Sequence, residues 1–191
     1  GEILDEMRSR SRMRLEGASH SAAVARACSY FSPVRAFDDM TGGIEYFHFL
    51  EKTADAYSKD EKFRKELVRK LKETAEKLFA ADNLMVGYTA DEEGYKALPE
   101  ELKKFKAALS DKPSRRYAFE FVPELKNEGF KTSSKVNYVA RCGSFDAEAY
   151  TGALEVLKVI MNYEYLWQNL RVIGGAYGCM SNFGRSGTGC L

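Results

Sequence analysis

Arg171 and Tyr177 are the two residues whose types and spacing best suit chemistry. They stand six positions apart, with Gly174, Gly175 and Ala176 between them. A guanidinium and a phenol are hydrogen-bond donors suited to a carbonyl or an oxyanion, and paired glycines let the backbone take positive φ and let another chain come close. The same glycines could instead serve only to end the preceding helix, and spacing alone favours that simpler interpretation.

A family resemblance favours the chemical interpretation. The segment Arg171-Val-Ile-Gly-Gly-Ala-Tyr-Gly178 resembles the Arg-x-x-Gly-Gly-Ala-Tyr-Gly motif in the C-terminal half of the pitrilysin/insulinase zinc peptidases, most closely the presequence-protease branch. The segment Gly17–Pro33 is similar to a stretch upstream in that half, so the resemblance spans nearly the whole chain. It implies that Arg171 and Tyr177 are catalytic, reaching across a closed chamber to the zinc site of the other half. It also implies that Gly174, Gly175 and Ala176 bind substrate.

The chain itself has no recognisable zinc motif. Its two histidines, His20 and His48, stand 28 residues apart and belong to neither His-x-x-Glu-His nor His-Glu-x-x-His. We therefore predict no metal ligand and no cofactor in this chain, and the resemblance implies that the N-terminal half of the parent binds zinc. The four cysteines are scattered without a Cys-x-x-Cys pair, which disfavours a zinc ribbon or a disulfide framework and predicts reduced thiols.

Composition and charge exclude several other functions. The chain has 29 Lys and Arg against 28 Asp and Glu, so its net charge of +1 indicates neither a nucleic-acid partner nor an anionic membrane. No apolar run approaches the ~20 residues of a membrane span, and no signal-peptide core opens the chain. We predict a soluble cytoplasmic protein, or one of an organelle matrix if the parent carries a transit peptide.

Periodicity predicts an α+β fold, with helices followed by a strand and then strand, helix and strand. The polar stretch Ser110–Arg116 predicts a domain boundary. The resemblance then implies that residues 1–112 are the tail of a third α+β unit and residues 113–191 the start of a fourth, with long helices on a mixed or antiparallel sheet. The clearest predicted helices are 58–81, 91–109 with a break at Pro99, and 147–167, and the predicted strands are 84–89, 117–122 and 134–142.

The two ends of the chain suggest a fragment of a longer polypeptide. Gly1 is not preceded by Met, and Cys190–Leu191 stops where an apolar strand would begin. We therefore expect the fourth unit to be incomplete, with an exposed sheet edge that the isolated fragment covers by forming a homodimer or exchanging strands. The expected partners are a peptide substrate and the N-terminal half of the same polypeptide.

These observations favour one function over two others. The prediction is a substrate-binding and transition-state-stabilising part of a zinc endopeptidase that degrades unstructured peptides, inactive as an isolated fragment. The alternative is a non-catalytic half that only forms the chamber wall. Nucleotide binding is disfavoured, because Gly174 and Gly175 follow a predicted helix, whose C-terminal dipole repels phosphate.

Overall fold

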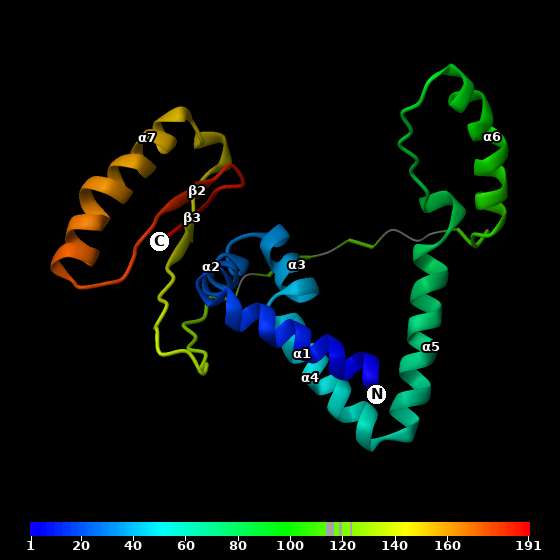
Figure 1. The fold of residues 1–191 in the computed structure, drawn as a ribbon, viewed down its shortest axis with the longest axis horizontal. Helices are drawn as coiled ribbons and strands as arrows, with labels where there is room; N and C mark the ends of the chain where they lie inside the picture. Colours follow the sequence, from blue (N-terminus) through cyan, green and yellow to red (C-terminus); the bar gives the residue numbers. More distant parts are fainter. Residues whose placement is uncertain (114–116, 119, 123) are drawn as a thin grey trace. The chain divides into compact units, whose positions relative to one another are not determined.

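The structure is a computed structural model that describes residues 1–113, 117–118, 120–122 and 124–191 (Figure 1). The predicted linker Ser110–Arg116 and the predicted strand 117–122 therefore lie partly outside the described residues. The helices are α1 (Glu2–Gly17), α2 (Ser19–Ser29), α3 (Pro33–Gly42), α4 (Ile44–Lys59), α5 (Glu61–Leu78), η1 (Ala81–Asn83), α6 (Glu92–Ala107), η2 (Ala147–Ala149), α7 (Gly152–Ile160) and η3 (Met161–Ile173). The strands are β1 (Cys142–Ser144), β2 (Asn182–Gly184) and β3 (Thr188–Cys190).

The chain divides into two compact units. The first joins residues 1–55 to residues 120–191, and the second consists of residues 56–119. This packing differs from the predicted division at residues 112 and 113, because the early helices pack with the C-terminal part of the chain. The predicted units were the repeated α+β units of a family, which are defined differently from the compact units of this chain. The division into a third and a fourth family unit therefore stays a prediction.

Helix boundaries in the first unit follow from capping side chains. Ser32 precedes α3, its hydroxyl accepts the Arg35 amide at 3.5 Å, and Pro33 occupies the first helical turn. Asp39 accepts the amide of Ile44, the first residue of α4, at 2.9 Å. α1 contacts α4 through the Arg12 guanidinium, which lies 5.7 Å from the centre of the Phe47 ring. Leu50 of α4 is the most buried large side chain of this helical group.

The sheet of the first unit is small and antiparallel, in the order β1-β3-β2. Cys190 of β3 is opposite Cys142 on one side and Asn182 on the other. Three residues, 185–187, connect β2 to β3, and Gly187 takes a φ of 79°, which only glycine adopts readily in such a turn. Residues 185–187 therefore form the tip of a β-hairpin.

A long helix precedes this hairpin. α7 continues without interruption into η3, whose hydrogen bonds follow a π-helical pattern. Leu166 of η3 is 3% exposed, and Asn162 binds the entry to β2 through its side chain: its amide donates to the Ser181 carbonyl at 3.2 Å, and its oxygen accepts the Ser181 N–H at 2.5 Å. These bonds hold the far end of the loop that carries the predicted motif.

The second unit is helical. α5 begins after Asp60, whose carboxylate accepts the amides of Lys62 at 2.7 Å and Phe63 at 3.2 Å. The amphipathic pattern that predicted α5 is confirmed as a helix, but no residue of α5 is buried, so its apolar face remains exposed within this unit. Pro99 lies inside α6 without ending it, which makes the predicted break there wrong.

The α+β class is confirmed, whereas two predicted strands are wrong. Residues 84–89 form no strand, and of residues 134–142 only Cys142 lies in a strand, although Arg141 just before it exchanges backbone hydrogen bonds with Leu191. Alternation of apolar and polar residues shows which side chains share a face. A strand also requires a neighbouring backbone to pair with, and residues 84–89 have none among the described residues. Within the part of the chain that is described, no helix is both long and apolar enough to cross a membrane.

Candidate functional site

The predicted motif lies at the C-terminal end of η3. Here three successive amides donate to carbonyls of the last helical turn: Gly174 to Asn169 at 3.0 Å, Gly175 to Arg171 at 3.1 Å and Ala176 to Leu170 at 2.9 Å. Gly175 has a φ of 73°, and a Cβ on Gly174 would lie 2.7 Å from the Leu170 carbonyl oxygen. Both positions therefore favour glycine where the helix ends in this way.

These hydrogen bonds bear on the substrate-binding role predicted for Gly174, Gly175 and Ala176. Their amides already have acceptors in the helix, so an approaching peptide would meet their carbonyls and their small surface instead. The glycines thus have a clear structural role, and their part in substrate binding stays a prediction.

Arg171 lies on an exposed side of the same helix end. Its guanidinium carbon lies 4.1 Å from the centre of the Trp167 ring, one turn earlier. Among the described residues no carboxylate pairs with this guanidinium, so its N–H donors remain available while the indole face holds the group in place.

Tyr177 lies in the loop that leaves the helix end. The residue is 93% exposed, and its hydroxyl has no hydrogen-bond partner within the described part of the chain. The loop is held at Gly174 by the helix cap and at Ser181 by Asn162. The structure thus brings Arg171 and Tyr177 to one helix end, with both side chains accessible.

A second group of polar side chains surrounds Arg26 of α2. The guanidinium binds the Asp39 carboxylate at 2.5 Å and the Glu128 carboxylate at 2.7 Å and 3.0 Å, and it lies 5.2 Å from the centre of the Tyr30 ring. Tyr30 also donates a hydrogen bond to Glu128. This Arg26 cluster joins α2 and α3 to a segment a hundred residues later, and sequence reasoning did not anticipate it.

Charge pairing changes the titration of the Arg26 cluster. Hydrogen bonding by Arg26 lowers the pKa of Glu128 from 4.5 to about 2, and burial followed by the hydrogen bond to Glu128 raises the pKa of Tyr30 to about 12. The pKa of Arg26 is raised, chiefly by its hydrogen bond to Glu128. All these groups keep their ordinary charge near neutral pH, so the Arg26 cluster serves structure and not proton transfer.

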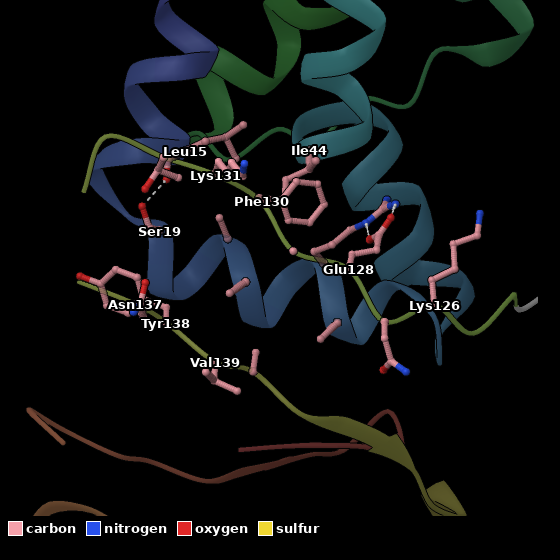
Figure 2. Close-up of a pocket in the computed structure, with 18 of the residues that line it drawn as sticks. Leu15, Ser19, Ile44, Lys126, Glu128, Phe130, Lys131, Asn137, Tyr138 and Val139 are labelled. Carbon is pink, nitrogen blue, oxygen red and sulfur yellow. Dashed lines mark hydrogen bonds and ion pairs between the residues drawn. The ribbon is translucent and has the colours of Figure 1, made fainter. Parts of the chain in front are cut away.

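A cavity of about 1110 Å³ lies beside the Arg26 cluster. Figure 2 shows that the segment after Lys126 runs past α2 through Glu128 and Phe130 and returns past Tyr138 and Val139. Helices α1, α2 and α4 supply the remaining walls. Neither Arg171 nor Tyr177 lines this cavity, so it is separate from the predicted site.

The histidines do not fit the zinc site that the resemblance implies for the parent. The His20 ring lies 5.9 Å from the ring of Tyr138, and the His48 ring lies 6.1 Å from Phe47 and 6.4 Å from Phe130. His20 is exposed beside one aromatic ring and His48 lies beside two, and no His-Glu set of ligands forms around either in the described chain. Neither ring therefore has the surroundings of a catalytic zinc ligand.

Three cysteines, unlike the histidines, lie close together in the structure. No spacing in the sequence predicted this cluster. Cys28, Cys142 and Cys190 come together with their Sγ atoms within 4.8 Å of one another, although 114 and 48 residues separate them along the chain. All four cysteines are unpaired thiols in this structure. A hydrogen bond from Cys142 lowers the pKa of Cys28 to about 7, while the interaction with Cys28 and burial raises the pKa of Cys142.

Comparison with known proteins agrees with the motif. Residues 1–52 match a family of regions described as associated with peptidases of family M16, subfamily C. The chain is 33% identical over 182 residues to protein HypA of Clostridium perfringens (strain 13 / Type A), a match that covers 92% of the chain and 18% of that protein. It is 26% identical over 185 residues to presequence protease 1, chloroplastic/mitochondrial, of Arabidopsis thaliana, covering 95% of the chain and 17% of that protein.

A mitochondrial presequence protease of Kluyveromyces lactis is 27% identical over 170 residues, or 83% of the chain and 17% of that protein. The chain thus spans less than a fifth of the length of each of these relatives. These matches support a relationship of the chain to a region of the pitrilysin-like M16 peptidases. The similar proteins reported above are presequence proteases and HypA.

Proposed function

We propose that this chain supplies the substrate-gripping and transition-state-stabilising side chains of a zinc-dependent endopeptidase. The observation that carries the proposal is the accessibility of Arg171 and Tyr177 at one glycine-capped helix end, with their hydrogen-bond donors unused. A purely structural Arg or Tyr would more commonly donate to a neighbouring acceptor, as Arg26 and Tyr30 do.

The two side chains would act on different parts of a peptide. During peptide hydrolysis, negative charge develops on the carbonyl oxygen as it becomes tetrahedral, and a donor aimed at that oxygen lowers the barrier more than it aids ground-state binding. The Tyr177 hydroxyl suits this task. Arg171, permanently charged and held by Trp167, would bind a backbone carbonyl near the scissile bond and so orient the peptide.

The remaining parts of the enzyme would come from elsewhere in the polypeptide. The histidines of this chain do not fit a catalytic zinc site, so its ligands would belong to the N-terminal half, with the two halves enclosing unstructured peptides in a chamber. On this proposal the isolated chain is inactive. Its compartment would be the cytoplasm or an organelle matrix, and the names of the Arabidopsis and Kluyveromyces relatives place those proteins in organelles.

Replacement of Tyr177 by Phe in the full-length protein tests the proposal. Loss of a single oxyanion donor typically costs about 2.7–4 kcal/mol of transition-state stabilisation, so kcat on an unstructured peptide should fall about 10²–10³-fold. KM should change little, because the hydroxyl acts mainly on the transition state. Steady-state kinetics with a fluorogenic peptide measures both constants.

Tyr163→Phe provides the matched control. Tyr163 is also an exposed tyrosine, at 71%, and it stands near the start of η3. This variant should retain the activity of the unmodified protein. Unchanged turnover in Tyr177→Phe would remove Tyr177 from the mechanism.

A non-catalytic chamber wall is the second candidate function. The exposed apolar side chains along α7 and η3, such as Val156, Val159 and Ile160, are consistent with a surface that faces another part of the polypeptide. A wall, however, has no need of unpaired donors at the helix end. A His-x-x-Glu-His sequence in the remainder of the polypeptide would favour the peptidase, and its loss would favour the wall.

A further inference from the structure

The three-cysteine cluster is assembled by the fold from three separate elements. Cys28 comes from the last turn of α2, Cys142 from β1 and Cys190 from β3. Arg141 and Leu191 exchange two backbone hydrogen bonds of 2.8 Å, so the next opposed pair, Cys142 and Cys190, occupies a non-hydrogen-bonded position. Side chains at such positions are close, with Cα atoms about 4.5 Å apart, and they point to one face of the sheet.

Cys28 completes the cluster from the facing helix. Its Sγ lies 3.1 Å from that of Cys142, and all three sulfur atoms lie within 4.8 Å of one another. Tetrahedral zinc with Zn–S bonds of about 2.3 Å requires sulfur atoms about 3.8 Å apart. The 3.1 Å between the Cys28 and Cys142 sulfur atoms is shorter than that value, and all separations stay within 4.8 Å, so the three thiols are close enough to share one ion after small side-chain adjustments.

The surroundings of the cluster favour a bound cation. Cys28 is 6% exposed and the other two thiols are half-buried. The cluster sits at the C-terminal end of α2, where the partial negative charge of the last carbonyls favours a positive ion. The backbone of Asn182, in the adjacent strand, forms a hydrogen bond with the Cys190 thiol. This bond orients the Cys190 sulfur as a metal ligand.

We propose that Cys28, Cys142 and Cys190 form a zinc site that fastens α2 to the sheet of the first unit. This site departs from the prediction of no metal ligand in the chain. Three thiolates are a soft donor set that selects a thiophilic ion, and no carboxylate joins them in the described chain. On binding, the three thiols release their protons to solvent and form three Zn–S bonds. A water molecule or an added ligand takes the fourth position.

A disulfide explains the arrangement less well. A bond between Cys28 and Cys142 would use two sulfur atoms and leave the third beside them without a role. Oxidation also requires an oxidant to reach the reacting thiolate, and Cys28 is almost completely buried. Zinc uses all three groups and needs no oxidant.

Metal titration of the purified, reduced chain tests the site. Zinc ions added to the metal-free chain under anaerobic conditions should bind at one ion per chain by native mass spectrometry. Cobalt(II) should give thiolate-to-metal charge-transfer absorption, and zinc should abolish it. Bound zinc should also slow alkylation of Cys28, Cys142 and Cys190 in the unmodified chain, and leave Cys179 as reactive as before.

Variants separate this site from adventitious binding. Cys28→Ser, Cys142→Ser and Cys190→Ser should each weaken zinc binding at least ~100-fold, since each removes a ligand. Cys179→Ser is the matched control, because Cys179 is a half-buried thiol outside the cluster, and it should bind like the unmodified chain. The proposal would be overturned if Cys28→Ser bound one zinc ion per chain as tightly as the unmodified chain, or if zinc protected Cys179 from alkylation as well as it protects the cluster. It would also be overturned if the chain bound no zinc and instead formed a Cys28–Cys142 disulfide. The alkylation measurement decides the matter even if a Ser variant does not fold.

Discussion

The Arg171–Tyr177 helix end and the Arg26 cluster use the same residue types in opposite ways. Arg26 is 14% exposed at its side chain and pairs with three carboxylates, those of Asp39, Glu45 and Glu128, and Tyr30 beside it donates to Glu128. Arg171 and Tyr177 are accessible and have no polar partner in the described chain. An Arg and a Tyr with satisfied donors hold a fold together, whereas an accessible pair with free donors can bind a partner. The difference lies in the surroundings, not in the residue types.

The sharpest test of this contrast is Arg26→Ala. Removal of the guanidinium leaves Asp39, which is 4% exposed at its side chain, as a buried charge without its partner. Breaking one side of a buried pair typically costs about 3–5 kcal/mol, so the chain should unfold at markedly lower urea concentration. Arg10→Ala removes the exposed pair with Glu6 and should change stability far less. Equal effects would remove the distinction between buried and accessible arginines.

Arg171→Ala should show the reverse behaviour. In the full-length protein it should lower kcat/KM about 10²-fold through misplacement of the peptide, while the urea midpoint of the chain stays almost unchanged. Arg185→Ala is the control, since Arg185 also lies over an aromatic ring, that of Tyr150 at 5.7 Å, but away from the helix end. A large loss of stability without a loss of activity would place Arg171 among the structural residues.

Acid should weaken the Arg26 cluster before it affects the helix end. Because the folded-state pKa of Glu128 is lowered from 4.5 to about 2, its contribution to stability is complete above about pH 4.5 and disappears as the pH falls toward 2. We expect a loss of about 2 kcal/mol over this range, allowing for solvent screening of a partly exposed carboxylate. Urea unfolding of Glu128→Gln should lack this part of the pH dependence, and an identical profile would contradict the assignment.

Gly175→Ala should have the smallest of these effects. Its φ of 73° costs an L-residue about 1–2 kcal/mol, although no atom lies within 4 Å of the added Cβ. The variant should therefore lose about 1 kcal/mol and keep its fold, as measured by urea unfolding. Gly178→Ala, at a position that is equally open and has no positive φ, is the control and should be neutral.

Local features could be predicted from the sequence better than pairings between distant residues. The helix α5 was predicted because its apolar period is a local property of the sequence. The strand predicted at residues 84–89 was wrong because alternation does not reveal whether a partner backbone exists. The break at Pro99 was wrong because a helix can tolerate one missing amide bond when the residues around it favour helix.

The candidate sites follow the same rule. Arg171 and Tyr177 stand within seven residues of each other and carry a motif, so they could be predicted, and so could the helix-ending role of Gly174 and Gly175. Arg26 and Glu128 are 102 residues apart, and Cys28 and Cys142 are 114 residues apart. No spacing rule connects such distant positions, because the topology of the chain alone brings them together.

The discontinuous first unit has a consequence for synthesis on the ribosome. Residues 1–55 leave the ribosome before residues 120–191, so Arg26 can pair with Asp39 at once, whereas its contact with Glu128 and the contact of Cys28 with Cys142 must wait for the later segment. Closing a loop of that length is entropically unfavourable and slow compared with forming a helix. The nascent chain therefore carries the Arg26 and Cys28 side of α2 without these contacts while the 102 and 114 residues to Glu128 and Cys142 are made.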